Sequence, residues 1–131
     1  MSKLRNLFVG LFSIAATIAL FSNFSPQQNT STMKSSKVIE LVVYQVNDTA
    51  KNNLALIDDR VTEQIQQFEG FIARRVHQSS EDSTIFMDYV TWESLAHAEK
   101  ANEQAQEMRE FQPFYSIINE VKSFTHYRVV D

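Results

Sequence analysis

Four side chains, Asp88, Trp92, Tyr44 and His126, have the chemistry to act on a small aromatic molecule. Asp88 and Trp92 lie four residues apart in the strand-like run TIFMDYVTW. Residues at even spacing share one face of a strand, and four steps of about 3.3 Å separate this pair by ~13 Å. An indole can stack on an aromatic guest, and a carboxylate can accept or orient its hydroxyl proton. The pair therefore predicts one wall of a cavity, with Phe86 on the same face.

A structural role is the alternative for the same pair. Buried carboxylates are usually satisfied by protein partners, which favours a simple ion pair for Asp88. Its partner would then be an arginine on a neighbouring strand: Arg74, Arg75 or Arg128. Trp92 would in that case pack in a subunit interface.

His126 and Tyr44 carry the same two interpretations. His126 alternates with Phe124 and Arg128, so it is either a base beside the cavity or a hydrogen-bonded interface histidine. Tyr44 shares a strand face with Val42, and it either offers a phenol to a ligand or packs in the interface. The catalytic candidates are therefore Asp88 and His126, and the ligand contacts are Tyr44, Trp92 and Phe86.

Composition excludes several classes of site. The sequence has no cysteine, which rules out thiolate nucleophiles and thiolate metal sites. Two glycines, Gly10 and Gly70, are too few for a glycine-rich phosphate loop. The net charge is -4, and no basic cluster exceeds Arg74–Arg75, so we expect no nucleic-acid partner. The three histidines lack metal-ligand spacing, and we expect neither a metal nor another cofactor.

Residues 1–32 differ in kind from the rest of the chain. Lys3 and Arg5 precede the apolar run LFVGLFSIAATIALF, and a polar segment follows it. This order is typical of an export signal. The run is about 22 Å long as a helix, shorter than a ~30 Å bilayer core, which favours a signal peptide over a membrane span. Because no clear cleavage site follows, an uncleaved membrane anchor with a polar linker stays open. We expect an exported protein, periplasmic or secreted, whose folded domain is 33–131.

The pattern of that domain predicts the order β-α-β-β-α-β. Gly70 is a natural left-handed stop for the first helix, whose apolar stripe runs from Leu54 to Phe68. The second helix starts near Glu93, with Leu95, Ala98, Ala101 and Ala105 inward. The predicted strands are Val38–Val46, Phe71–Gln78, Thr84–Trp92 and Val121–Val130. This is an α+β, ferredoxin-like arrangement, a four-stranded antiparallel sheet with helices on one face.

The other face of such a sheet lacks cover from its own chain. We assign Ile85, Met87, Tyr89 and Thr91 to the helices, so that the set containing Asp88 and Trp92 faces outward with Val42 and Tyr44. An exposed apolar face of this size indicates an interface or a ligand site. A second copy related by two-fold symmetry would cover it, so we expect a homodimer.

The turn FEGFIARRVHQSSEDS, the segment FMDYVTWESLAHAEKA and the element order resemble the antibiotic biosynthesis monooxygenase-like domains, which belong to the dimeric α+β barrel superfamily. The resemblance covers Val38 to Val130. It implies a homodimer with a cavity under the helices or between the sheets. Some members oxidise aromatic polyketides with O₂ and no metal or flavin, since the substrate's own anion activates oxygen.

Related members degrade haem with an Asn on the first strand, a Trp ending the third and a His about ten residues later. Trp92 matches the tryptophan, whereas the first strand has no Asn and Asn102 stands at the histidine position. The resemblance therefore implies a small aromatic or hydrophobic ligand rather than haem, and a cofactor-independent monooxygenase as the activity. The alternative is a non-catalytic dimeric binding or structural module at the cell envelope.

Overall fold

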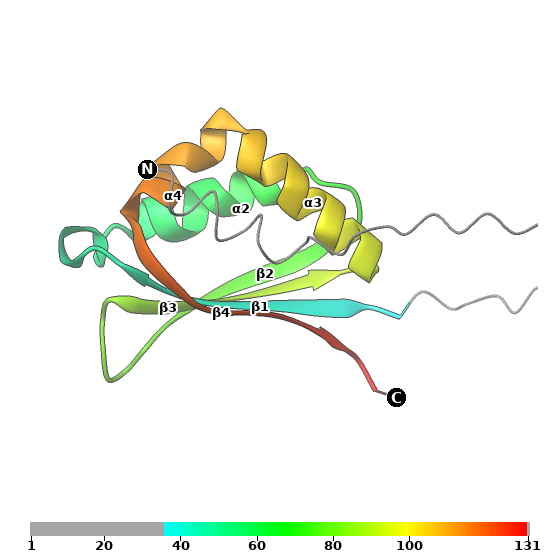
Figure 1. The fold of residues 1–131 in the computed structure, drawn as a ribbon, viewed down its shortest axis with the longest axis horizontal. Coiled ribbons are helices and arrows are strands. Elements are labelled where there is room, and N and C mark those ends of the chain that lie inside the picture. The colour runs from blue at the N-terminus through cyan, green and yellow to red at the C-terminus, as the bar shows by residue number, and fades with distance from the viewer. Residues whose placement is uncertain (1–35, 131) are drawn as a thin grey trace, which may run out of the picture. The chain divides into compact units, whose positions relative to one another are not determined.

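Four strands form one antiparallel sheet in the computed structural model, which describes residues 36–130 (Figure 1). The sheet order is β2-β3-β1-β4. The strands are β1 (Val38–Val46), β2 (Phe71–Gln78), β3 (Ile85–Trp92) and β4 (Ile118–Arg128). The predicted ferredoxin-like α+β fold is confirmed. The predicted signal or anchor in 1–32 lies outside the described residues, and no helix within 36–130 is long and apolar enough to cross a membrane.

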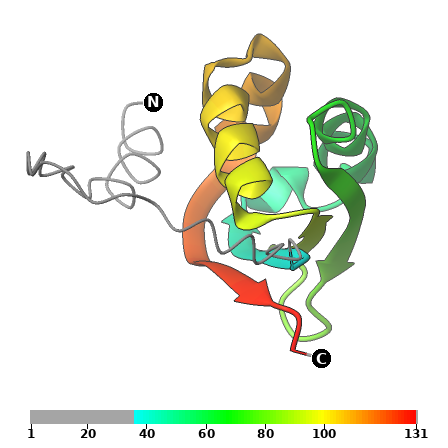
Figure 2. The same ribbon diagram turned by 90° about the vertical axis from the view of Figure 1, so that its right-hand side faces the viewer.

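All helical segments lie on the same side of the sheet (Figures 1 and 2). Two of them, α2 and α3, run next to each other above the strands (Figure 2). The segments are η1 (Asp48–Ala50), η2 (Ala55–Asp59), α2 (Arg60–Ile65), α3 (Leu95–Glu107), η3 (Arg109–Phe111) and α4 (Gln112–Ile117). The opposite face of the sheet has no cover from residues 36–130.

The first helical region is shorter and more broken than its sequence pattern predicts. The side chain of Asn53 accepts a hydrogen bond from the backbone N–H of Leu56 at 3.2 Å, which starts a new turn there. A π-helical turn, η2, follows before α2. Leu54, predicted to be buried, is 53% exposed because it precedes this start. Gly70 has a φ of +79°, which confirms its left-handed conformation at the end of the region.

The alanine-rich helix α3 packs closely on the sheet. Ser94 caps it by accepting a hydrogen bond from the backbone N–H of His97 at 3.2 Å. Ala98, Ala101 and Ala105 are buried as predicted. Leu95, also predicted to face inward, is 40% exposed, because it lies in the first turn, just past the end of β3.

The last strand starts three residues earlier than predicted. Ile118 leaves α4 with extended backbone (φ −81°, ψ 121°) and pairs with Val46 on β1. The strand ends at Arg128 rather than at Val130. Two register irregularities in the β1–β4 pairing accommodate the extra length.

The predicted assignment of the sheet faces is wrong. Phe86, Val90 and Trp92 are each 1% exposed and lie under the helices, while Ile85 and its alternating neighbours face away. The physical reason is the partner of Asp88, because the buried Arg74 guanidinium that binds this carboxylate also binds the Ile57 carbonyl in the helix layer. Val90 and Trp92 form one buried cluster with Ala98 and Ala101. The candidate residues of the sequence therefore occupy the helix–sheet layer.

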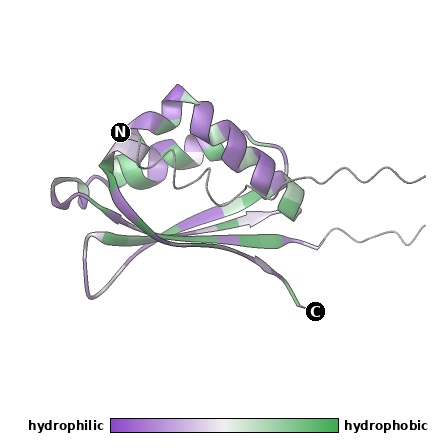
Figure 3. Ribbon diagram, in the orientation of Figure 1, coloured by the Kyte–Doolittle hydropathy of each residue, from purple (hydrophilic) through white to green (hydrophobic). Residues whose placement is uncertain are grey.

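The uncovered face is nevertheless apolar. Register places Leu41 and Val43 of β1 beside Tyr89 and Met87 of β3 on this face, and all four are half-buried. At its β4 edge, Tyr127 pairs with Ile39 and is 50% exposed. Figure 3 shows hydrophobic colour along parts of the strands. The prediction of a bare apolar face holds, but its residues are the other set.

Candidate functional site

Asp88 is the centre of a buried polar network in the helix–sheet layer. Its Oδ1 accepts a hydrogen bond from the Tyr44 hydroxyl at 2.9 Å. Its Oδ2 accepts two from Arg74, from Nε at 3.0 Å and from Nη2 at 2.7 Å. The predicted arginine partner is thus Arg74. Arg75 cannot take this role, since it is exposed and neighbours Tyr89 on the uncovered face.

Arg74 uses all of its donors, and its side chain is 0% exposed. Nη2 also donates to the Ile57 carbonyl at 2.9 Å, and Nη1 donates to the Asp58 carbonyl at 3.0 Å and to Thr62 Oγ1 at 2.8 Å. The Asp58 carboxylate lies 3.3 Å from Nη1. Two of these acceptors belong to the π-helical turn η2, whose irregular backbone turns carbonyls toward the sheet. Arg74, which lies on β2, therefore uses its five donor hydrogens to link Asp88 on β3 to the helix layer.

Burial sets the protonation of this network. Burial raises the pKa of the Asp88 carboxyl, and the Arg74 guanidinium and the Tyr44 hydroxyl act against that rise. Burial also raises the pKa of the Tyr44 phenol far above its ordinary value, and the neighbouring Asp88 charge adds to the effect. Tyr44 consequently stays protonated and donates to Asp88 across the physiological range.

A second buried network was missed by reasoning from the sequence. Glu40 on β1 is 3% exposed, and its Oε2 accepts a hydrogen bond from Asn102 Nδ2 on α3. His126 Nε2 lies 2.9 Å from the same oxygen, so the predicted base contacts Glu40 and not Asp88. The available signal was an acid inside the apolar run VIELVVYQV, the same signal that singled out Asp88.

The two carboxylates are close enough to influence each other. Glu40 pairs with Val90 and Asp88 pairs with Val42, which makes the two acids diagonal neighbours on adjacent strands, about 7–8 Å apart. The charge of Glu40 contributes to the raised pKa of Asp88. The two acids thus share one sheet face but have separate partners. Asp88 binds Arg74 and Tyr44, and Glu40 binds His126 and Asn102.

Trp92 lies at the end of this face with an unused donor. Its side chain is 1% exposed, and Phe71 packs edge-on against it with ring centroids 5.8 Å apart. Among the described residues, no hydrogen-bond acceptor reaches its Nε1. A buried donor without an acceptor costs about 1–3 kcal/mol, so such groups in folded proteins call for an explanation.

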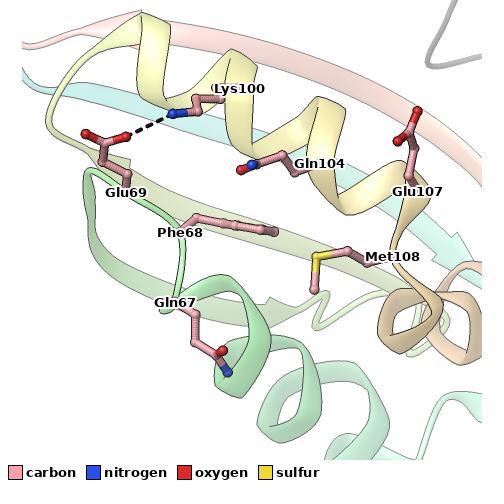
Figure 4. Close-up of a pocket in the computed structure, with 7 residues that line it drawn as sticks. All are labelled: Gln67, Phe68, Glu69, Lys100, Gln104, Glu107 and Met108. Carbon is pink, nitrogen blue, oxygen red and sulfur yellow. Dashed lines mark hydrogen bonds and ion pairs between the residues drawn. The ribbon is translucent and has the colours of Figure 1, made fainter.

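An open groove of about 520 Å³ is lined by residues of α3 and of the turn after α2 (Figure 4). Phe68 points into the space between α3 and the turn after α2, with Met108 beside it (Figure 4). Phe68 also packs against the buried cluster that contains Trp92. The rim is polar and consists of Gln67, Glu69, Lys100, Gln104 and Glu107.

The structure brings together most of the predicted site residues. Tyr44 and Phe86 stack with ring centroids 6.1 Å apart, and Tyr44 contacts Asp88. Trp92 shares their sheet face at the far end of β3. His126 lies across β1 from them, on β4. Tyr44, Phe86, Asp88 and Trp92 therefore share the sheet face under the helices, and their role as the wall of a ligand cavity stays a prediction.

The fold and these sites define an α+β domain of the ferredoxin-like class. Comparison with solved structures makes the type more specific. An antibiotic biosynthesis monooxygenase-type protein from Bordetella bronchiseptica superposes with a TM-score of 0.64 at 15% identity, covering 73% of this chain and 99% of that chain. A protein of the same description from Nitrosomonas europaea gives 0.62 at 17% identity, covering 73% and 92%. The cofactor-independent oxygenase SnoaB from Streptomyces nogalater gives 0.56 at 10% identity, covering 74% and 94%.

The domain thus has the antibiotic biosynthesis monooxygenase-like fold. No protein-family profile matches the sequence, and no curated protein is similar to it at a significant level. At these identities the likeness concerns the fold. Activity has to be argued from the buried networks and from Trp92.

Proposed function

We propose that this protein binds a small aromatic molecule between its helices and its sheet and oxidises it with O₂, without a metal or flavin. The observation that carries the proposal is the buried indole N–H of Trp92, which lacks an acceptor among the described residues. A ligand carbonyl or phenolate oxygen would supply that acceptor. The fold of SnoaB, a cofactor-independent oxygenase, supports the type of reaction.

The chemistry needs a substrate that provides its own electrons. For a methylene flanked by aromatic rings, O₂ places one oxygen on the carbon as a carbonyl, and the other leaves as water with the two methylene hydrogens. The protein has to orient the ring and stabilise the substrate anion that transfers the first electron. A donor aimed at the developing oxyanion in a dry site does this, and the Trp92 N–H is that donor in our proposal. Asp88 is the acid proposed to accept the proton, and the Tyr44 hydroxyl, which stays protonated, holds it in place.

Dimerisation and export belong to the same proposal. The apolar face around Leu41 and Tyr89 has no cover from residues 36–130, and a second copy would bury it by two-fold symmetry. The basic residues Lys3 and Arg5 before an apolar run favour export, with the domain released or tethered by that segment. We therefore infer a homodimer that acts outside the cytoplasm.

One observation favours a second candidate function, a non-catalytic dimeric module. Both carboxylate oxygens of Asp88 are occupied by Arg74 and Tyr44, which is how a purely structural acid is satisfied. In that case the polar network serves to hold the sheet to the helices. The two candidates differ in whether a ligand reaches Trp92.

The test uses the fact that Trp92 is the single tryptophan of the chain. We would titrate the protein with anthrone, naphthols and 1,4-naphthoquinone and follow Trp92 fluorescence, with Trp92→Phe as the blank. An oxygen electrode would follow O₂ uptake with anthrone in the presence of a metal chelator. Saturable quenching together with uptake supports the oxygenase. Quenching without uptake leaves binding alone, and silence in both supports the structural module.

A further inference from the structure

The end of the sheet at which β1 begins brings together four segments that are far apart in the sequence. One row of paired residues crosses the sheet there: Phe71, Trp92, Val38 and Arg128. The row joins the start of β2, the end of β3, the start of β1 and the end of β4. Figure 1 shows the first turn of α3 and the C-terminus at this same end.

Four large apolar side chains next to this row are open to solvent, and we call them the apolar end. They are Ile72 (39% exposed), Leu95 (40%), Val129 (45%) and Val130 (93%). The other exposed large apolar side chains within residues 36–130 are Leu54, which comes after the far end of β1, and Tyr127 on the uncovered sheet face. Exposed apolar surface outside that face is therefore concentrated at one end of the domain.

The local backbone explains why these side chains stay outside the core. Ile72 falls at the register irregularity between Phe71 and Ala73, on an edge strand. Leu95 lies in the first turn of α3, before the buried alanines begin. The Val129 N–H donates to the Lys37 carbonyl at 3.4 Å, which holds the apolar C-terminal segment beside the start of β1.

The chain comes to this end of the domain from its N-terminal apolar run. Residues 22–37 connect Phe21, the last residue of that run, to Val38 at the start of β1. Even when fully extended, a segment of this length spans at most about 55 Å. A run that stays in a bilayer would therefore hold the domain close to the membrane by its β1 end. Such a tether raises the effective concentration at the surface, so a small apolar patch is enough for contact.

We propose that the apolar end docks on the surface of a lipid bilayer. The inference rests on the export and tethering in the proposed function and adds the orientation of the domain on the membrane. Side chains of Ile72, Leu95 and Val129 enter the boundary between headgroups and acyl chains, where burial of apolar area provides the binding energy. The opposite end of the strands, with the turn between β2 and β3, then faces away from the bilayer.

The charges around the row indicate that the contact does not need anionic lipid. Two basic residues, Lys37 and Arg128, adjoin the row together with two acidic residues, Glu69 and Glu93. A patch with balanced charge gains little from a negative membrane surface, unlike a polybasic segment. We therefore expect docking on bilayers of phosphatidylcholine alone.

The test uses the full chain reconstituted in phosphatidylcholine vesicles. Because the sequence has no cysteine, one introduced cysteine carries an NBD fluorophore at a known position. Leu95→Cys and Val129→Cys label the apolar end, and Ser80→Cys labels the exposed turn between β2 and β3 as the control. We expect lipids with a nitroxide near the headgroup to quench the labels at positions 95 and 129 about twofold or more strongly than the label at position 80, because docked side chains reach about 5–10 Å into the boundary.

A second pair of variants tests the apolar contact itself. With the label at Val129→Cys, the further change Ile72→Glu should lower the quenching about twofold or more, because a charge opposes insertion. Leu54→Glu is the matched control, an exposed apolar side chain away from the apolar end, and should leave the quenching unchanged. Both changed positions are exposed, and circular dichroism checks that the variants fold.

The outcomes separate docking from the proposed reaction. Equal quenching at all three labelled positions overturns docking, even where naphthoquinone still quenches Trp92 in the unlabelled protein. Strong quenching at positions 95 and 129 supports docking, even where Trp92 stays silent and the proposed reaction fails. Quenching that needs anionic lipid overturns the apolar contact. NBD emission at position 129 that responds to protein concentration in detergent but not to vesicles assigns the apolar end to a second copy and overturns the proposal.

Discussion

Replacing Arg74 with methionine would remove the one cation that residues 36–130 place within hydrogen-bond reach of Asp88, while keeping much of the side-chain volume. Asp88 is 7% exposed and would keep only the Tyr44 hydroxyl as a partner. Breaking a buried ion pair from one side costs about 3–5 kcal/mol, and we expect Arg74→Met to lie in that range. The carbonyls of Ile57 and Asp58 lose their donor in the same variant, which places the effect toward the upper end.

The reverse replacement, Asp88→Asn, should cost less. Arg74 would retain the Asp58 carboxylate at 3.3 Å and two backbone carbonyls, so its charge stays partly compensated. We expect about 1.5–3 kcal/mol, the range for losing a hydrogen bond to a charged group. The double variant should be more stable than the sum of the two losses predicts, by about 1–3 kcal/mol, because the groups are in direct contact.

The assay is urea unfolding followed by circular dichroism at pH 7 and pH 4. Arg74 opposes the burial-driven rise in the pKa of Asp88, so removing it raises that pKa further. A folded-state pKa above the unfolded value of about 3.9 gives stability that is present at low pH and lost as the pH rises through the folded pKa. The deficit of Arg74→Met should therefore be larger at pH 7 than at pH 4. Arg75→Met, on the other face, is the control and should change stability by less than about 0.5 kcal/mol. A larger loss from Asp88→Asn than from Arg74→Met, or strict additivity, would refute the reasoning.

Three further predictions test other parts of the fold. Gly70→Ala should destabilise the protein by about 1–2 kcal/mol from its positive φ, and by more from a Cβ placed 2.2 Å from His97 Cγ. His97→Ala in the same chain should recover only part of the second loss in urea unfolding, because the Cβ of residue 97 stays 2.5 Å from the new Cβ. Above about pH 10 the stability should fall, because the raised pKa values of Tyr44 and Tyr115 keep these two phenols protonated in the folded protein while they ionise in the unfolded chain. In the double variant Tyr44→Phe/Tyr115→Phe, the rise in phenolate absorbance at 295 nm that accompanies unfolding should be lost. Leu41→Lys, in the middle of the uncovered face, should convert the dimer to a monomer, as measured by size exclusion with light scattering. A wild-type protein that is itself a monomer at high concentration would refute the dimer.

The order of elements could be predicted from the sequence because each segment has its own local signal. Strand runs alternate or are β-branched, Gly70 ends the first helical region, and alanines recur at helical spacing in the second helix. These are local properties, and they define the ferredoxin-like class without knowledge of long-range contacts.

The choice of sheet face could not be predicted, because β3 is apolar on both sides. The deciding partner is Arg74, fourteen residues away on β2, together with carbonyls from a π-helical turn that no sequence pattern announced. The link from Glu40 to His126 spans 86 residues and was likewise not visible in local patterns.

The most direct test of a ligand site under the helices is the two-dimensional ¹H–¹⁵N NMR spectrum of the single tryptophan side chain. With one tryptophan in the chain, the Trp92 Nε1–H gives one indole signal. We predict a saturable downfield shift of its proton on adding 1,4-naphthoquinone and none on adding naphthalene. A signal that stays in place at saturating naphthoquinone, or moves equally with both compounds, would contradict the proposal that this donor holds the ligand.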